Sequence, residues 1–413
     1  MKMKDSGIEW IGEIPEMWEK VKFNAIYNNR NTKVSDRDYE PLSVTKKGIV
    51  PQLDTAAKTN DNDNRKLVRS GDFVINSRSD RRGSCGISSL DGSVSLINTV
   101  LEPRNSQIES LYFDFLFHTV QFADEFYKWG HGIVDDLWTT NWNDMKNITL
   151  ILPSKSEQQQ ISNFLDHKTA EIDGLIDKIN AEIENLKQYQ SSVITQAVTK
   201  GLDPNVPMKD SGIEWIGKIP ETWKIVKIKY LVKPVVFKDN LSNLNWRYIG
   251  LENVEKNTGR LITTTTNYPD KIYNVCRKGD VLYSKLRPNL AKVLIAPFDS
   301  CCTGEFEVLS TLNNRWIKYC LLSDGITKMT TAATYGVKMP RVSWKDLSNY
   351  KIPLPSSDVI EDINNYLDLK LQMVNDLIKH KQQQIDQLLE YKKSLIFEYV
   401  TGKKQVPQVE GRN

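Results

Sequence analysis

The 413-residue sequence is poor in the residues that build disulfide frameworks and metal centres. It contains only five cysteines and four histidines. The cysteines, Cys85, Cys276, Cys301, Cys302 and Cys320, form no Cys-x-x-Cys pair, so we expect neither a disulfide framework nor a thiolate zinc site. The adjacent Cys301 and Cys302 are expected to point to opposite faces of a strand and to pack inertly. No metal site is predicted for this chain.

Long apolar runs are also missing. No uncharged apolar stretch approaches the roughly 18 residues of a membrane-spanning helix, and no apolar segment follows the first lysines, as a secretory signal would require. We therefore expect no membrane association and a cytoplasmic location. Apolar residues make up 39% and charged residues 26% of the chain, which is enough for packed cores. The length predicts about two to three domains.

The motifs of common catalytic sites are absent or incomplete. The sequence has no HExxH, no GxSxG and no Pro-Pro, so it also lacks the Asp/Asn-Pro-Pro-aromatic motif of adenine methylation. Residues 212–218 have the skeleton of a phosphate-binding loop, but Ile219 replaces the required Ser or Thr. A turn anchored by Trp10 and Trp215 is the favoured interpretation. We expect no catalytic residue and no cofactor in this chain, and assign any catalysis to another chain.

An internal repeat organises the whole sequence. Residues 3–18, MKDSGIEWIGEIPEMW, and residues 208–223, MKDSGIEWIGKIPETW, agree at fourteen of sixteen positions. Trp142 and Trp344 each begin a Trp-x-Asp segment that is followed, at the same spacing, by Leu-Pro-Ser. The chain is therefore two tandem units of about 205 residues each.

The middles of the two units hardly align. Between residues 24–140 and 229–338 one local likeness survives, Gly71–Val74 against Gly279–Leu282, and a basic stretch follows each. Shared edges and different middles predict common scaffolding around two differently tuned surfaces.

Two long helices are predicted at the ends of the units. In residues 153–202 and 355–402 apolar residues recur in steps of three, four and seven, which is typical of an amphipathic helix close to a heptad pattern. Ser156 is the predicted start signal of the first helix, and Gly201 and Gly402 are the predicted stops. Helices of some 40 residues, about 60 Å long, cannot bury their apolar stripes alone. We expect them to pair as an antiparallel coiled coil.

The middles themselves are rich in β-branched residues, aromatics and turn signals, which predict globules with short, irregular strands. Residues 110–129 predict a helix that packs on the sheet. The predicted fold class is mixed α/β (α+β), with two globular domains joined by two long antiparallel coiled-coil helices in a pseudo-twofold repeat. The predicted divisions are a first domain at 1–152, a helix at 153–202, a second domain at 203–354, a helix at 355–402 and a tail at 403–413.

Positive charge is concentrated locally although the net charge is only +3. Residues 65–82 hold six basic residues against two acidic ones, and residues 271–292 hold six against one. Both stretches lie where the divergent middles still correspond. Lys and Arg neutralise phosphates and short polar side chains read base edges, so DNA contact is one interpretation and a solvated charged face is the other. The candidates are Asn76, Arg78, Arg81 and Arg82 in the first stretch, and Lys285, Arg287, Asn289 and Lys292 in the second.

A second candidate surface precedes each Trp-x-Asp segment. It comprises residues 132–140 in the first unit and 335–341 in the second. Lys338 and Arg341 suit a loop that approaches a nucleic-acid backbone. A loop that merely caps the sheet is the alternative.

The duplicated Gly-Ile-Glu-Trp-Ile-Gly-x-Ile-Pro block, the Leu-Pro-Ser segments that run into long helices, and the divergent middles together resemble the specificity (S) subunit of type I restriction-modification systems. The resemblance covers nearly the whole chain. The family's Leu-Pro-x-x-x-Glu-Gln pattern is present at residues 152–158, and the second copy departs from it after Pro355.

The resemblance implies that each middle is a target recognition domain for one half of a bipartite, asymmetric site in double-stranded DNA. The helices would set the gap between the half-sites and dock two modification subunits and two restriction subunits. S-adenosylmethionine, ATP and magnesium would belong to those partner subunits. Two other functions stay open: a non-catalytic coiled-coil scaffold that displays two protein-binding globules, and a single-chain restriction enzyme, which would need catalytic residues that the sequence lacks.

Overall fold

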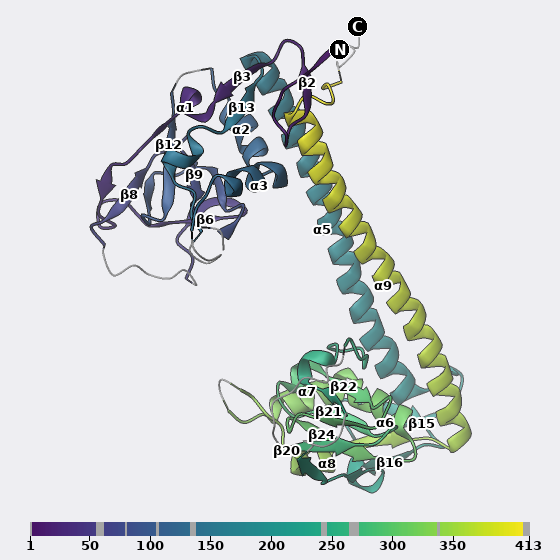
Figure 1. Ribbon diagram of the computed structural model, residues 1–413. Helices are drawn as coiled ribbons and strands as arrows, with labels where there is room; N and C mark the ends of the chain where they lie inside the picture. Colours follow the sequence, from purple (N-terminus) through teal and green to yellow (C-terminus); the bar gives the residue numbers. More distant parts are fainter. Residues whose placement is uncertain are drawn as a thin grey trace. The chain divides into compact units, whose positions relative to one another are not determined.

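The computed structural model describes residues 2–54, 62–78, 81–104, 107–132, 138–240, 246–263, 272–336 and 339–407. Its internal contacts divide the chain into two units. The first unit comprises Met1–Asp177 with Gln384–Asn413, and the second comprises Lys178–Gln383. Each unit thus contains one globule, part of one long helix and part of the other (Figure 1).

The two long helices are α5, Lys155–Lys200, and α9, Ser357–Val400. The predicted start at Ser156 is wrong, because Ser154 caps α5: its hydroxyl accepts from the Glu157 amide at 3.3 Å, and the Glu157 carboxylate accepts from the Ser154 amide at 3.1 Å. The predicted stops are confirmed. Gly201 and Gly402 follow the helices with φ of 78° and 72°, a left-handed conformation that glycine adopts without a Cβ penalty.

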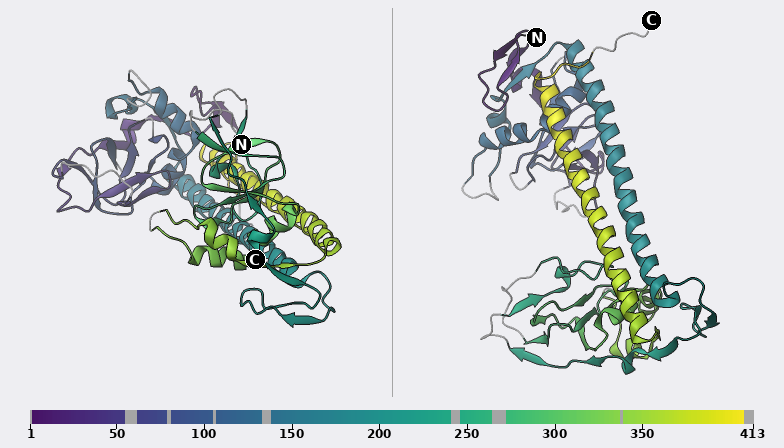
Figure 2. Two further views of the ribbon diagram at one scale, coloured as in Figure 1. Left: turned by 90° about the horizontal axis from the view of Figure 1, so that it is seen from below. Right: turned by 90° about the vertical axis from the view of Figure 1, so that its right-hand side faces the viewer.

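Within each unit, α5 and α9 run side by side in opposite directions (Figures 1 and 2). Residue numbers rise along α5 as they fall along α9 in the contacting pairs, which confirms the antiparallel pairing. These pairs are Phe164–Tyr399 and Asp173–Lys392 in the first unit, and Glu182–Lys381 and Gln190–Asn375 in the second.

The first globule is built from short strands with a few helices. Its strands are β1 (Met3–Asp5), β2 (Glu13–Pro15), β3 (Glu19–Lys22), β4 (Tyr27–Asn29), β5 (Lys33–Val34), β6 (Leu42–Thr45), β7 (Gly48–Pro51), β8 (Arg65–Val68), β9 (Phe73–Asn76), β10 (Cys85–Ile87), β11 (Gly92–Val94), β12 (Asn98–Pro103) and β13 (Thr149–Leu152). Its helices are α1 (Phe23–Ile26), α2 (Ser110–Phe117), α3 (Val120–Lys128) and α4 (Trp142–Met145).

The second globule has the same character. Its strands are β14 (Met208–Asp210), β15 (Lys218–Pro220), β16 (Lys224–Lys227), β17 (Lys233–Pro234), β18 (Lys238–Asn240), β19 (Arg247–Ile249), β20 (Ile272–Cys276), β21 (Val281–Ser284), β22 (Val293–Ile295), β23 (Ser300–Cys302), β24 (Phe306–Ser310) and β25 (Lys351–Leu354). Its helices are α6 (Asn314–Leu322), α7 (Asp324–Ala332) and α8 (Trp344–Asn349), with short 3₁₀ turns η3 (Ile228–Tyr230), η4 (Leu251–Asn253) and η5 (Pro288–Leu290).

Strand order recurs between the globules even where the sequences do not align. The central antiparallel sheet is β10-β9-β12-β4 in the first unit and β22-β21-β24-β17 in the second. Both units also have a hairpin, β1-β2 or β14-β15, and a two-stranded sheet that leads into a long helix, β13-β3 or β16-β25. The second sheets differ, with β11-β8-β5 beside β6-β7 in one unit and β18-β20-β23-β19 in the other. The divergent middles therefore share one architecture.

The repeated sequence block forms the hairpin in both units. The Asp5 carboxylate accepts from the Gly7 amide at 2.8 Å, and Asp210 accepts from Gly212 at 2.9 Å. The segment with the phosphate-loop skeleton is thus part of a β-hairpin, as the turn interpretation predicted. On the long-helix side, the Trp18 indole donates to Glu157 at 3.1 Å and so joins the block to the start of α5.

Each globule shares its core with the ends of the long helices. The first core is an aromatic cluster around Phe23, Phe73 and Phe117 that Leu395 and Val400 of α9 complete. In the second core Trp223 and Trp316 meet edge to face at 6.1 Å, beside residues of both long helices. Burial of each such side chain contributes about 1.5–3 kcal/mol, so the helix ends are integral to each fold.

Two local expectations have clear outcomes. The single helix predicted near residues 110–129 is wrong: the segment forms α2 and α3, because the Thr119 hydroxyl accepts from the Phe122 amide at 3.2 Å and starts a new helix. Cys301 and Cys302 on β23 enter different hydrophobic clusters, as predicted. All five cysteines are buried, and none of them forms a disulfide. Among the described residues, no helix is both long and apolar enough to cross a bilayer, and no cluster of His, Cys, Asp or Glu is able to hold a metal ion.

Candidate nucleic-acid interface

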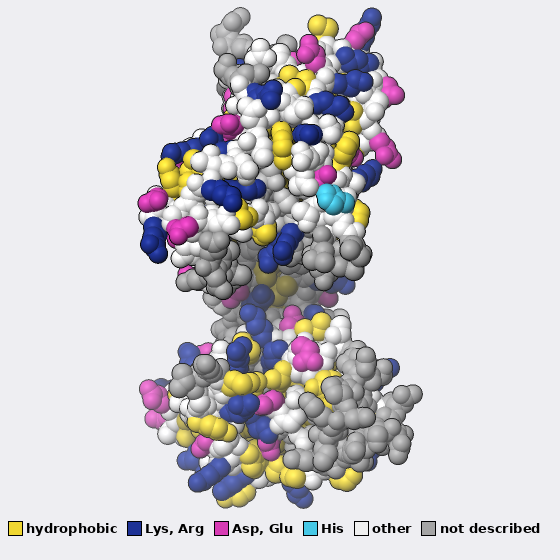
Figure 3. All heavy atoms as spheres, turned by 60° about the vertical axis from the view of Figure 1, so that its left-hand side comes forward, with side chains coloured by type: hydrophobic (Ala, Val, Ile, Leu, Met, Phe, Trp, Pro, Cys, Tyr) yellow, Lys and Arg dark blue, Asp and Glu magenta, His cyan; other side chains and the backbone are white. Residues whose placement is uncertain are grey.

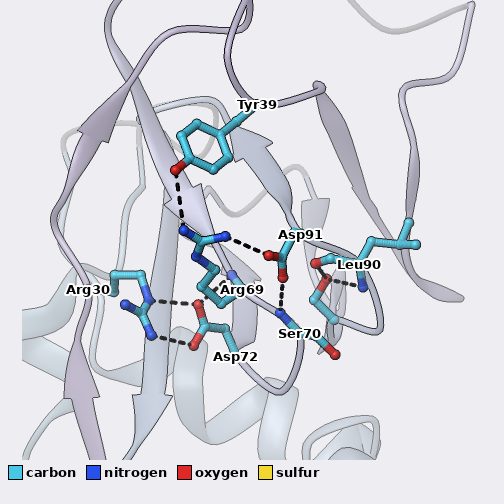
Figure 4. A network of polar contacts seen from close by, with 8 residues as sticks. Arg30, Tyr39, Arg69, Ser70, Asp72, Leu90 and Asp91 are labelled. Carbon is cyan, nitrogen blue, oxygen red and sulfur yellow. Dashed lines mark hydrogen bonds and ion pairs between the residues drawn. The ribbon is translucent and has the colours of Figure 1, made fainter.

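Several basic residues of the two charged stretches are used to build a repeated turn. The turn is Arg69–Asp72 in the first unit, drawn in Figure 4, and Arg277–Asp280 in the second. In each, the arginine amide donates to the aspartate at 2.8 Å. The arginine side chains reach a second carboxylate, with Arg69 donating to Asp91 at 2.6 Å and Arg277 to Asp299 at 2.9 Å.

This turn has the same electrostatics in both units. The Ser70 amide and the Arg69 guanidinium hold the pKa of Asp91 below its ordinary value. The Lys278 amide and the Arg277 guanidinium do the same for Asp299. Charge counted along the sequence therefore overestimates the charge available to a ligand.

Two further basic residues of the first stretch face the protein. Arg65 is buried and donates to the Ser93 hydroxyl at 2.8 Å. The Lys66 ammonium donates to the Asn98 carbonyl at 2.7 Å, and burial lowers the pKa of this lysine. Arg78, Arg81 and Arg82, by contrast, are exposed.

The exposed candidates lie on one loop in each unit, which we call the tip loop: the described residues 77, 78 and 81–83 after β9, and residues 285–291 after β21. The two tip loops close in the same way. The Asn76 amide donates to the Ser84 carbonyl at 2.9 Å, and the Ser284 amide donates to Lys292 at 3.0 Å. At the matched last position Gly83 and Ala291 have φ of 75° and 40°.

The second candidate surface adjoins the tip loop in both units. Arg78 forms an antiparallel bridge with Thr139, and Leu286 forms one with Arg341. The Arg287 amide also donates to the Pro340 carbonyl at 2.8 Å. The two surfaces proposed from the sequence are thus one surface in each unit, a juxtaposition that no sequence pattern indicated.

In the first unit the candidate residues differ in whether other protein groups hold their side chains. Asn76 is buried, and its side chain accepts from the Arg78 amide at 3.0 Å, so it shapes the loop. Arg82 pairs with Asp124 and lies over the Tyr127 ring, 5.3 Å from its centroid. Arg78 makes no ion pair with any described carboxylate.

In the second unit most candidate cations have protein partners. Lys285 lies 3.4 Å from Glu307, and Lys292 donates to the Leu251 carbonyl at 2.6 Å. Arg341 makes a two-pronged contact with Glu305, at 2.6 and 3.0 Å. This arginine holds the pKa of Glu305 below its ordinary value.

Arg287 and Asn289 are exposed, and their side chains bond to no described residue. Lys338 lies outside the described residues. Figure 3 shows Lys and Arg side chains spread over one face of each unit, with hydrophobic and some Asp and Glu side chains between them. The role of each candidate residue in DNA contact stays a prediction.

With this geometry in place, comparison with known proteins gives the family. Residues 15–185 and 220–387 match the family described as "Type I restriction modification DNA specificity domain". The two matches fall one in each copy of the repeat and together cover most of the chain. The chain belongs to the type I restriction-modification DNA specificity domain family.

Relatives of known function agree with this assignment. The chain is 25% identical over 232 residues to the "Type I restriction enzyme EcoDI specificity subunit" of Escherichia coli, which covers 51% of this chain and 52% of that protein. It is 26% identical over 310 residues to the "Type I restriction enzyme MjaVIII specificity subunit" of Methanocaldococcus jannaschii, covering 68% and 69%. The chain thus spans about half the length of the E. coli relative.

Solved structures share the architecture. A chain from a structure of a type I R-M system superposes with a TM-score of 0.68 at 15% identity, covering 95% of this chain and 99% of that one. The HsdS subunit from Thermoanaerobacter tengcongensis superposes with a TM-score of 0.50 at 17% identity, covering 95% and 98%. At these identities the likeness concerns the fold alone, and it confirms the predicted mixed α/β class with two long helices.

Proposed function

We propose that this chain is the DNA-reading and assembly subunit of a type I restriction-modification complex. Each globule reads one half of a bipartite, asymmetric sequence in double-stranded DNA. The family match over both copies of the repeat carries this proposal. It is supported by the two tip loops, which are closed at their base by the same backbone hydrogen bond in both units and differ in the described residues they expose.

DNA contact is assigned to the tip loop and its neighbour in each unit. In the first unit the contacts come from Arg78, Arg81 and Arg82, and in the second from Arg287 and Asn289 with the segment that contains Lys338. Arginines pair with phosphates and with guanine edges, and asparagine pairs with adenine. Two half-sites of different sequence require two loops that are held in the same way but carry different side chains.

The long helices are proposed to fix the gap between the half-sites and to dock the partner subunits. Half-sites on one side of a duplex lie about 34–36 Å apart per helical turn, and a paired helix holds a spacing better than a flexible linker. The pseudo-twofold repeat offers two similar docking surfaces, which fits two modification and two restriction subunits. This chain performs no catalytic step, the cofactors S-adenosylmethionine, ATP and magnesium belong to those partners, and the complex acts in the cytoplasm.

The test is to map N6-methyladenine by single-molecule sequencing in cells that express this chain with its cognate modification subunit. We expect methylation on both strands of a split motif with a fixed gap, and loss of the mark when this chain is removed. An assembled complex that methylates without sequence preference would sink the proposal. No motif-linked methylation would favour the protein-binding scaffold instead.

A further inference from the structure

We propose that the second unit reads two purines of its half-site with Arg287 and Asn289, and that the neighbouring Lys285, Lys292 and Arg341 position these readers without contacting DNA. This inference rests on the proposed function and adds which side chains specify bases. It names guanine as the target of Arg287 and adenine as the target of Asn289, both in the major groove.

The first observation is backbone strain at the tip. Arg287 has φ of 50° and Ala291 has φ of 40°, and they are two of the three non-glycine residues with positive φ in the described part of the chain. They flank the turn η5, which carries Asn289. Residues with a Cβ adopt this conformation only where the surroundings fix it, and such positions gather at functional sites.

The surroundings do fix it. The Arg287 amide donates to the Pro340 carbonyl at 2.8 Å, and the Asn257 amide donates to Leu290 at 3.1 Å. Pro288 is buried beneath the turn. The tip is therefore held on both sides and from below, and its two exposed side chains start from a rigid backbone.

The second observation is that the surrounding cations are already occupied. Arg341 clamps Glu305 with two contacts, and Lys285 faces Glu307. The Lys292 ammonium reaches back to a carbonyl of the neighbouring turn η4. A phosphate would have to compete with these bonds. The Lys285–Glu307 pair joins the tip loop to β24, and the Arg341–Glu305 contact joins the adjoining segment to the residue just before β24. Their role is to hold the tip in place.

Arg287 and Asn289, unlike the cations around them, have side chains available to a ligand. Both are exposed, and neither side chain bonds to a described residue. A guanidinium donates two parallel hydrogen bonds to guanine O6 and N7, and a carboxamide pairs with adenine N6 and N7. Presenting these groups on a rigid tip lowers the ordering cost of binding, which is the arrangement that base discrimination needs.

The repeat gives independent support. The tip loop of the first unit has the same closure and a positive φ at the matched last position, where glycine stands. Counting from β9 and β21, Arg81 of the first unit occupies the position of Asn289. The closure of the loop is common to both units while an exposed residue on it changes, as expected of a position that sets specificity.

The experiment maps methylated motifs for the full complex with Arg287→Ala, Arg287→Lys or Asn289→Ala. Each Arg287 variant should relax one guanine position in one half-site, with discrimination there falling about 5- to 150-fold. Asn289→Ala should relax an adenine position in the same half-site. The other half-site and the gap stay unchanged.

Two controls bracket this result. Lys278→Ala removes an exposed cation elsewhere in the second unit and should leave the motif intact. Arg81→Ala should alter the opposite half-site. Arg287→Lys keeps the charge and most of the side chain, so it decides the matter if the alanine variant fails to assemble.

Three outcomes would overturn the inference while leaving the proposed function intact. They are an unchanged motif, a uniform loss of methylation with every base preference kept (a phosphate contact), and relaxation at an A·T pair with the Arg287 variants or at a G·C pair with Asn289→Ala. A wild-type complex without any motif would instead count against the proposed function itself.

Discussion

The two glycines that end the long helices form a matched pair that tests the packing at each helix end. A Cβ built on Gly402 would lie 2.4 Å from Cδ of Pro15 and 2.8 Å from Cη2 of Trp18. A Cβ on Gly201 would meet Trp223 at 3.2 Å, its nearest contact. Both glycines have a left-handed backbone conformation, so alanine strains the backbone similarly at each position. Only Gly402→Ala also creates a severe clash.

The expected magnitudes follow from these distances. The left-handed conformation costs a residue with a Cβ roughly 1–2 kcal/mol. Overpacking against a proline ring and a buried indole adds about 1–3 kcal/mol. We therefore expect Gly201→Ala to lower the free energy of unfolding of the second unit by about 1–2 kcal/mol, and Gly402→Ala to lower that of the first unit by about 2–5 kcal/mol.

The assay is urea unfolding of the full chain, followed by tryptophan fluorescence and circular dichroism. Because the two units can unfold in separate transitions, midpoints are compared with wild type for each transition. The difference between the two variants isolates the clash, since the backbone term is common. Equal shifts, or a larger shift for Gly201→Ala, would refute the packing described for Pro15 and Trp18.

Three further predictions concern the helix pair, a half-buried histidine and DNA. Gln190→Leu should lower the free energy of unfolding, measured in urea, by about 1–3 kcal/mol because it leaves Asn375 unpaired. Adding Asn375→Leu should recover most of this loss, and a double variant as unstable as the single one would contradict the prediction. Burial lowers the pKa of His118, but the hydrogen bond and charge of Asp114 outweigh burial and raise this pKa above its ordinary value. Protonated His118 therefore stabilises the fold below about pH 6.5, and this stabilisation is lost as pH rises through the folded-state pKa. His118→Gln should therefore lose stability relative to wild type in acid and not in alkali, and urea midpoints with no pH-dependent difference would argue against it. Arg78→Ala should reduce the slope of log Kobs against log salt for DNA binding by about 1, and an unchanged slope would mean that Arg78 meets no phosphate.

The long helices were predictable because their signals are local. Each helix has an apolar stripe that recurs along consecutive residues and a glycine just after its end, and each helix forms as these signals indicate. The misplaced start of α5 had a usable signal too. Ser154 stands three residues before Glu157, which is the capping-box spacing, and it marks the cap more clearly than Ser156 does.

The interiors of the globules were less predictable because their contacts are distant in sequence. Strand β9 pairs with β12, more than twenty residues later, and strands this short carry little periodicity. Charge counting failed for a similar reason. Arg69 reaches Asp91 across a turn, and Arg65 is buried beside Ser93, so a run of basic residues contained both structural and exposed members that the sequence does not distinguish.

Buried strands and hydrogen bonds support each tip loop, while exposed side chains on the loop differ between the units, and this separation explains how one chain holds two different recognition surfaces. The repeated turns at Gly71 and Gly279 orient the central strands, and hydrogen bonds at the base of each tip loop close it in the same way. Exposed side chains on such a frame contribute little to stability, since surface substitutions usually change it by about 0.5 kcal/mol or less. Tip residues are therefore free to differ between the units without disturbing the cores that join each globule to the long helices. Under the proposed function, exposed residues such as Arg81 and Asn289 set specificity, while the scaffold proposed to space the half-sites and to dock the partner subunits stays constant.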